Sequence, residues 1–326
     1  MTSRASKGIY WLAPFAVCGS LLCGSPAWAD DLPSGPIKII VGFGPSSTAD
    51  TVARLVARYI TDKVGHPVIV ENRPGNSSMV AAEYVAHAAN DGRTLFMSTI
   101  ANTLYPAHNK MKFDLGKDLQ PVALLAVVPN LLVANPSLNV HSVSDLVKLA
   151  KAKPETLSFG TSGQWTASYM AAEMFNMQAG TKITTVPYQG GANQAVLDLI
   201  SGRINLMFNV AATLAQHVKT GKLTALAVGQ PKRASIVPDV PTMDEAGMPG
   251  FDVGIWIGML AAPGTSPKIV DAFSKYANEA VHSKDAEMAL HAQGMDVLGG
   301  TPQEFSAFIE KDIQKWTRIL ASTGLK

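Results

Sequence analysis

Residues 37–58 read IKIIVGFGPSSTADTVARLVAR, and this stretch contains the strongest signals of secondary structure in the chain. It begins with a mostly β-branched run, Ile37–Val41, of the kind found in strands that are buried on both faces. Glycine, proline and serine break the run between Gly42 and Ser47, and from Val52 apolar side chains recur at helical spacing. The stretch therefore predicts a buried strand, a tight polar turn and an amphipathic helix.

The turn predicts a helix cap and also an anion site. Ser47, followed three residues later by Asp50, is typical of a capping box, in which an acid lies near the positive end of the helix dipole. A glycine- and serine-rich turn that leads into a helix also exposes unpaired N–H groups, which bind phosphate or carboxylate without a cationic side chain. Both interpretations of the turn stay open.

The N-terminus predicts export. Arg4 and Lys7 precede an apolar run over residues 9–22, and Ala27-Trp28-Ala29 has the small-x-small pattern of a signal-peptidase site. We therefore expect residues 1–29 to be a cleaved signal peptide. No later stretch offers about twenty uninterrupted apolar residues, so no membrane span is expected.

The mature chain has a balanced charge and no cysteine. Removing residues 1–29 from the 326 leaves 297 residues, with 25 basic and 25 acidic side chains, and removes both cysteines. Neither disulfides nor thiolate chemistry are then available, and nothing indicates nucleic acid or an anionic membrane as a partner. The length allows two domains of ordinary size.

Strand and helix patterns alternate in two blocks. A long apolar segment, residues 122–134, is interrupted at Pro129 and separates the blocks. Short connections between alternating strands and helices predict parallel sheets covered by helices. After the first strand, further strands are predicted at 66–70, 94–98, 157–159, 184–186, 206–209, 223–228 and 254–260.

The end of the chain indicates two domains. Helices predicted at 267–282, 285–293 and 302–320 have no sheet of their own, so we expect them to pack on the first domain. The chain then crosses between domains near Val128 and near Gly254, which predicts a hinge and a ligand cleft between two Rossmann-like α/β domains. The expected division is 1–29 as signal peptide, 30–127 with 254–326 as domain 1, and 128–253 as domain 2.

Patterns for catalysis are incomplete. The histidines show no ligand-like spacing and have no cysteine partners, so no metal is expected. Gly160-Thr161-Ser162-Gly163 lacks the second glycine of a hydrolase elbow, because Gln164 stands there. Gly42-x-Gly44 begins a dinucleotide fingerprint, but Ser47 replaces its third glycine. Polar turns without a nucleophile or an acid–base pair favour binding of a small carboxylate, without a cofactor and without catalysis.

Several segments of the mature chain match one known family in order. They are VGFGPSSTAD, VIVENRPGNSS, KDLQPVALLA, FGTSGQWTAS, TTVPYQGGA, DLISGRINLMFN, PDVPTMDEAG and TPQEFSAFIEKDIQKW. Together they resemble the substrate-binding proteins of tripartite tricarboxylate transporters, also called Bug proteins. The resemblance implies a type II periplasmic binding protein, which closes like a Venus flytrap on a small organic carboxylate and delivers it to membrane transporter subunits.

The resemblance also implies that turns of both domains hold the ligand. On the first domain it implies Phe43, Pro45, Ser46, Ser47, Thr48 and Asp50, with Ser98, Thr99 and Asn102 as flanking contacts. On the second domain it implies Thr161, Ser162, Gly163, Thr166, Ser168, Gln189, Gly190, Gly191, Ala192 and Asn209, and Trp165, which departs from the family pattern, is added as a predicted ligand contact.

Departures from the family pattern bear on the ligand. Ser46-Ser47 and Ser77-Ser78 stand where the family usually has Gly-Gly, which narrows the backbone choices and adds hydroxyl donors. Gln164-Trp165 replaces Asn-Gly, so an indole either stacks on a flat ligand, narrows the pocket or packs on neighbouring helices. Asn209 replaces a common acid, which removes a charge that pairs with an amine. The expected ligand is a carboxylate without an essential amino group, either aliphatic or aromatic.

Two other functions stay open at this point. A sensor that presents its closed form to a membrane receptor would have the same binding site. An exported α/β hydrolase would need a nucleophile and a base brought together in the cleft, with Ser162 as the candidate nucleophile. A monomer is expected, because no exposed apolar stripe argues for assembly.

Overall fold

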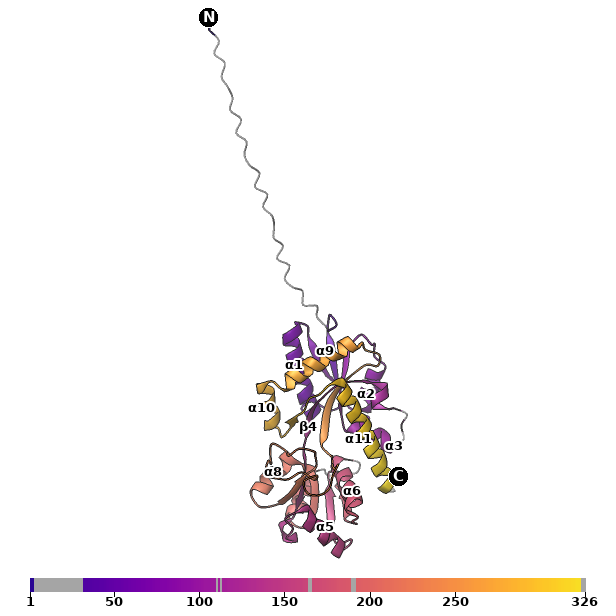
Figure 1. Cartoon of the computed structure of the whole chain (residues 1–326), viewed down its shortest axis with the longest axis vertical. Coiled ribbons are helices and arrows are strands. Elements are labelled where there is room, and N and C mark those ends of the chain that lie inside the picture. Colours follow the sequence, from indigo (N-terminus) through magenta and orange to yellow (C-terminus); the bar gives the residue numbers. More distant parts are fainter. Residues whose placement is uncertain (3–31, 110, 112, 164–165, 189–191, 324–326) are drawn as a thin grey trace. The chain divides into compact units, whose positions relative to one another are not determined.

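The computed structural model describes residues 1–2, 32–109, 111, 113–163, 166–188 and 192–323. The predicted signal peptide lies almost entirely outside these residues. Residues 31–326 form one compact unit, which contains two mixed β-sheets with helices packed on them (Figure 1). No helix in the described ranges is long and apolar enough to cross a membrane.

The first sheet has the strand order β11-β4-β10-β3-β1-β2. As predicted, β1 (Ile37–Val41) is buried on both faces, since Ile40 belongs to one hydrophobic core and Ile39 to the other. It pairs in parallel with both of its neighbours, and β10 pairs antiparallel with β3 and β4. The other strands are β2 (Val68–Asn72), β3 (Thr94–Thr99), β4 (Gln120–Val128), β10 (Ile255–Ala261) and β11 (Asp296–Val297).

The second sheet has the order β7-β6-β8-β5-β9. β6 pairs in parallel with β7 and β8, whereas β5 pairs antiparallel with β8 and β9. The prediction of parallel sheets is therefore wrong for β5 and β10. Each of these strands enters its sheet from the other sheet, without the helical crossover that a parallel pair requires. The strands are β5 (Asn130–Ala134), β6 (Ser158–Thr161), β7 (Thr184–Pro187), β8 (Leu206–Val210) and β9 (Thr224–Val228).

The helices cover both sheets, and the terminal helices pack as predicted on the elements of the first sheet. α9 contacts α1 and β4, and α11 contacts α3 and β4 and reaches α6. The division into two domains at 127/128 and 253/254 stays a prediction. The helices are α1 (Thr48–Val64), α2 (Met79–Ala86), α3 (Ala101–Asn109), α4 (Leu115–Asp118), α5 (Val143–Ala152), α6 (Ala167–Ala179), α7 (Ala192–Ile200), α8 (Ala211–Lys219), α9 (Pro267–Val281), α10 (Lys284–Ala292) and α11 (Pro302–Thr323).

Asp50 holds the turn between β1 and α1. The predicted cap is confirmed, because Ser47 Oγ accepts a hydrogen bond from Asp50 N at 3.2 Å. The Asp50 carboxylate, 2% exposed, accepts from Ser46 N at 3.0 Å, from Asn72 Nδ2 at 2.8 Å and from the Arg54 guanidinium at 2.9 and 3.0 Å. Burial by itself raises the pKa of Asp50, but these hydrogen bonds outweigh it and hold the pKa below its ordinary value.

The turn before α2 carries backbone strain. Asn76, Ser77 and Ser78 have φ angles of 47°, 51° and 74°, a region that favours glycine. Ser78 is 1% exposed, and no described residue forms a hydrogen bond with its hydroxyl. The hydroxyl packs against Gly42, where an added Cβ would overlap with Ser78 Oγ. Serine at this position therefore combines a strained backbone with an unpaired buried hydroxyl.

Replacing Ser78 with glycine should stabilise the protein by about 1 kcal/mol. The change relieves a left-handed conformation and removes a buried unpaired hydroxyl, and the larger backbone entropy of unfolded glycine offsets part of the gain. Urea unfolding at pH 7 measures the effect. Ser266→Gly, at a helix cap with a φ of −60°, is the control and should lose a few tenths of a kcal/mol. Equal losses in both variants would contradict the strain at Ser78.

Replacing Asp50 with asparagine should destabilise the protein by about 2 kcal/mol at pH 7. The loss stays below that of a fully buried ion pair, because the Arg54 side chain is 53% exposed. The stabilisation by Asp50 is fully present above the ordinary pKa of 3.8 and is lost as the pH falls through the lower pKa of the folded state.

Denaturant unfolding of both proteins over a range of pH checks this expectation. The difference in unfolding free energy between wild type and Asp50→Asn should shrink as the solution is acidified below pH 3.8. Asp62→Asn removes a charge from the exposed side of α1 and is the matched control. A difference that stays constant on acidification would show that the Asp50 charge is not the stabilising feature.

Candidate functional site

Those predicted ligand residues that the structure describes lie at the carboxyl ends of strands in both sheets. β1 and β3 are parallel neighbours in the first sheet, and β6 and β8 are parallel neighbours in the second. The carboxyl ends of parallel strands meet at one edge of a sheet, where open α/β sheets bind ligands. The structure thus gathers the predicted residues at one edge of each sheet.

The turn after β1 exposes hydroxyl groups to solvent, and hydrogen bonds from Asn72 and to Asp50 hold the turn in place. Ser46 and Thr48 are exposed, as is Pro45, whereas Phe43 is half-buried. Phe43 O accepts a hydrogen bond from Asn72 Nδ2 at 2.9 Å, so Asn72 joins the turn to the Asp50 carboxylate. Asp50 itself has both oxygens committed within this network, and it therefore positions the turn.

The flanking residues after β3 are buried and bonded to one another. Asn102 Oδ1 accepts from Ser98 Oγ at 3.1 Å and from Thr99 N at 3.2 Å. The Asn102 amide nitrogen lies 3.7 Å from Met79 Sδ. Ser98 and Asn102 are 0% exposed, so their side chains are buried and their polar atoms face protein rather than solvent.

A cluster of hydroxyl groups lies at the N-terminus of α6. Ser168 Oγ accepts from Ser162 N at 3.0 Å and lies 2.8 Å from Ser162 Oγ and 2.9 Å from Thr166 Oγ1. Thr166 caps α6 by accepting from a backbone N–H in its first turn at 3.3 Å, and it donates to Gly163 O at 2.8 Å. Thr161, which is fully buried, also donates to Gly163 O. Gly163 has a φ of 135°, which favours glycine there.

Asn209 contributes an unpaired amide group. Its side chain is 5% exposed near the end of β8, and its Nδ2 has no hydrogen-bond partner among the residues that the structure describes. A buried amide donor without a partner is unfavourable by about 1–3 kcal/mol, so such a group calls for an acceptor that the protein does not supply. Ala192, the first residue of α7, is half-buried.

A cavity of about 380 Å³ joins elements of both sheets. Thr166, which precedes a helix on the second sheet, lines this cavity together with Ser77 and residues of α3, which follow strands of the first sheet. The sequence analysis did not predict helix α3, so it did not place Tyr105 and His108 near the ligand site. It noted Ser77 only as a departure from the family pattern. The cavity is lined by Ser77, Ala101, Leu104, Tyr105, His108, Asn109 and Thr166.

Some predicted residues lie outside the described part of the chain. They are Trp165, Gln189, Gly190 and Gly191. Within the described part, no group of three or more histidine, cysteine, aspartate or glutamate side chains is placed to hold a metal ion.

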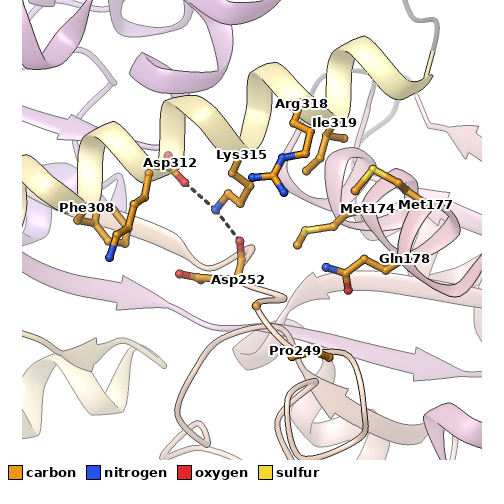
Figure 2. A pocket seen from close by; sticks show the side chains of 12 residues that line it. Met174, Met177, Gln178, Pro249, Asp252, Phe308, Asp312, Lys315, Arg318 and Ile319 are labelled. Atoms are coloured by element: carbon orange, nitrogen blue, oxygen red, sulfur yellow. Dashed lines mark hydrogen bonds and ion pairs between the residues drawn. The ribbon is translucent and has the colours of Figure 1, made fainter.

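A larger pocket, of about 410 Å³, lies between α6 and α11 and contains none of the predicted ligand residues. Figure 2 shows Lys315 between Asp312 and Asp252, with its Nζ 2.6 Å from Asp312 Oδ1 and donating to Asp252 O at 2.6 Å. Asp312 Oδ2 accepts from the indole N–H groups of Trp256 and Trp316 at 3.0 and 3.1 Å. This charged cluster ties α11 to the segment before β10.

Comparisons with known proteins agree with this geometry. Residues 52–325 match the family described as tripartite tricarboxylate transporter family receptor. BugT of Bordetella pertussis is 34% identical over 305 residues, which cover 93% of each chain. The structure of R. palustris Rpa4515 with adipate is 31% identical with a TM-score of 0.68, covering 90% of this chain and 98% of that one. MatC of Rhodopseudomonas palustris with bound malate is 29% identical with a TM-score of 0.66, covering 89% of this chain and all of that one.

These likenesses cover most of the chain and confirm the predicted fold class. The two mixed α/β sheets are those of type II periplasmic solute-binding proteins. Seven of the eight motifs that carried the resemblance lie within the matched residues, and VGFGPSSTAD, at residues 41–50, precedes them. The chain therefore belongs to the tripartite tricarboxylate transporter receptor family, whose members are periplasmic, non-enzymatic solute receptors.

Proposed function

We propose that this receptor captures a small organic carboxylate between its two sheets and delivers it to membrane subunits of a tripartite tricarboxylate-type transporter. The observation that carries the proposal is the unpaired, 95%-buried amide of Asn209, at the edge where the other predicted ligand residues gather. A ligand carboxylate supplies the acceptor that this amide lacks. Adipate in Rpa4515 and malate in MatC are carboxylates, which supports the same class of ligand here.

Neutral donors suit reversible binding of an anion. The hydroxyl cluster of Ser162, Thr166 and Ser168 lies at the N-terminus of α6, and the exposed hydroxyls of Ser46 and Thr48 lie at the N-terminus of α1. Helix N-termini carry partial positive charge and bind anions without a cationic side chain. Within the described part of the chain, no lysine or arginine lines the cavity between the sheets. The site therefore holds a carboxylate without a fixed ion pair that would slow its release.

The charge balance of the site favours a ligand without an amino group. Asp50 is the one carboxylate among the predicted ligand residues, and its oxygens are bonded to Ser46, Arg54 and Asn72. An ammonium group on the ligand would find no uncommitted carboxylate among them. We therefore propose a plain mono- or dicarboxylate, with the choice between an aliphatic and an aromatic body left to direct measurement.

Asn209→Asp should weaken binding of plain carboxylates at least about tenfold, equivalent to about 1.4 kcal/mol. The new charge repels the ligand and replaces the only unpaired donor of that side chain. Isothermal titration calorimetry with adipate, malate, benzoate and aspartate measures the change, and aspartate should gain affinity relative to the others. Asn139→Asp, exposed at the opposite edge of the second sheet, is the matched control. Strong binding of amino acids and none of plain carboxylates by the wild type would contradict the proposal.

A thermal-shift panel of mono- and dicarboxylates identifies the ligand class directly. A ligand at one hundred times its dissociation constant should stabilise the folded state by about 2.7 kcal/mol. Native mass spectrometry of the exported protein should show a monomer, a retained anion and a mass that corresponds to cleavage after Ala29. If no anion stabilises the protein, the carboxylate proposal fails.

Transport and sensing are separated by uptake measurements in cells. Deleting the receptor should abolish uptake of the labelled carboxylate that the panel identifies, and restoring the wild-type chain should recover it. Uptake that persists while a transcriptional response to the ligand is lost would instead support a sensor.

A further inference from the structure

A third cavity, of about 270 Å³, lies beside the strands that connect the two sheets. It is smaller than the two cavities described above. We call it the connector pocket. Its walls include Val127 near the end of β4, Trp256 in β10, Asp296 in β11, Phe308 in α11 and Gln230, which follows β9 of the second sheet. None of its lining residues is among the predicted carboxylate ligands. Whatever occupies it is therefore distinct from the carboxylate site.

The Gln230 amide is oriented by its neighbour. Gln230 is 3% exposed, and its Nε2 donates to Asp296 Oδ2 at 3.2 Å. An ionised carboxylate only accepts hydrogen bonds, so the amide nitrogen must face Asp296 and the amide oxygen must face away from it. That oxygen, Gln230 Oε1, is buried and has no hydrogen-bond partner within the described ranges.

The unpaired oxygen lies near Gly254, together with a second acceptor. A Cβ added to Gly254 would lie 2.6 Å from Val127 Cγ2, 3.6 Å from Gln230 Oε1 and 3.7 Å from Asp252 Oδ1, so a methyl group of Val127 covers Gly254. Gln230, Asp252 and Gly254 all line the connector pocket. Asp252 Oδ1 accepts only a long hydrogen bond, from Gly254 N at 3.4 Å. Two acceptor oxygens with little or no hydrogen bonding thus lie near Gly254 in the lining of the pocket.

The charges around the pocket leave this position acceptor-rich. Asp296 also accepts from Ser235 N at 3.2 Å, through its other oxygen. Of the cations that line the pocket, Arg233 is committed to Glu245 at 2.9 Å, and Lys232 is exposed. Burial raises the pKa of Asp252, while the nearby charge of Lys315 opposes the rise.

The remaining walls are apolar and define the shape of the occupant. Leu124, Val127, Leu298 and the rings of Trp256 and Phe308 line the pocket, and the two rings meet edge to face with centroids 5.7 Å apart. A volume of about 270 Å³ is slightly below the range typical of drug-sized ligands, so the pocket suits a single ring or a short chain.

We propose that the connector pocket binds a small apolar primary ammonium ion, whose N–H groups donate to Gln230 Oε1 and to the Asp252 carboxylate while its hydrocarbon body packs on Trp256 and Phe308. An ammonium group has three donors and no acceptor, which matches a position that offers only acceptors. An alcohol supplies one donor, and a carboxylate is repelled by Asp252 and Asp296. The proposal does not rest on carboxylate transport.

Cyclohexylammonium chloride is the probe, with cyclohexanol and cyclohexanecarboxylate as ligands of matched shape. The indole N–H resonance of Trp256 in the ¹⁵N-labelled protein is the readout. It is assigned by comparison with Trp165→Phe and Trp316→Phe, because residues 30–326 contain three tryptophans. We expect a saturable shift of this resonance with the amine and at least about tenfold weaker binding of the alcohol. Equal affinity for amine and alcohol, or no saturable shift with the amine, would leave only a water-filled cavity and overturn the proposal.

Two variants test the acceptors independently, after circular dichroism has confirmed that each is folded. Asp252→Asn and Gln230→Met should each weaken cyclohexylammonium at least about tenfold and reduce its preference over cyclohexanol. Asp62→Asn removes the same charge from the exposed side of α1 and should leave the titration unchanged. Unchanged amine binding in either folded pocket variant would overturn the assignment of that acceptor and of the site with it.

Discussion

The side chain of Asn130 joins the two connections between the sheets. It follows Pro129, where the chain passes from β4 to β5, and it is 1% exposed. Its Nδ2 donates to Val253 O at 2.6 Å, Gly229 N donates to Asn130 O at 2.8 Å, and Val253 N donates to Gly229 O at 2.8 Å. Because the outward and returning segments are hydrogen-bonded to each other, the two connections between the sheets lie side by side.

Asp312 attaches the last helix of the chain to the elements beside these connections. A carboxylate that is 3% exposed is unfavourable unless donors surround it. Asp312 Oδ2 accepts from Thr103 Oγ1 at 2.6 Å as well as from Trp256 and Trp316, and Lys315 pairs with Oδ1. Helix α11 is thereby held to α3 and β10 through one charge. The terminal helix reaches α6 from this anchored base, so it spans elements of both sheets.

The ligand edge combines strained turns with neutral donors. Ser46, Ser77 and Ser78 all adopt positive φ angles, where the family usually has glycine. A positive φ angle is unfavourable in conformational free energy for each of these serines. Ser46 in return places an exposed hydroxyl beside the N-terminus of α1. Hydrogen bonds to Asp50 and from Asn72 hold the first of these turns in its strained conformation. Binding without catalysis follows from the same chemistry, since hydroxyls, amides and helix N-termini hold an anion without reacting with it.

By itself the sequence determined the elements whose signals are local: the β-branched strand at 37–41, the Ser47 cap of α1, the repeated polar turns after strands and the family motifs. It did not predict α3, which contains Pro106, or α8, which has no side-chain cap, or the two-residue strand β11. Three features could be seen only in the folded structure. They are the antiparallel pairing of β5 and β10, the hydrogen bonds of Asp50 within its own turn, and the amide groups of Asn209 and Gln230, each of which has one atom without a partner among the described residues. These depend on partners far away in the chain, and no local pattern records whether a buried polar group finds one.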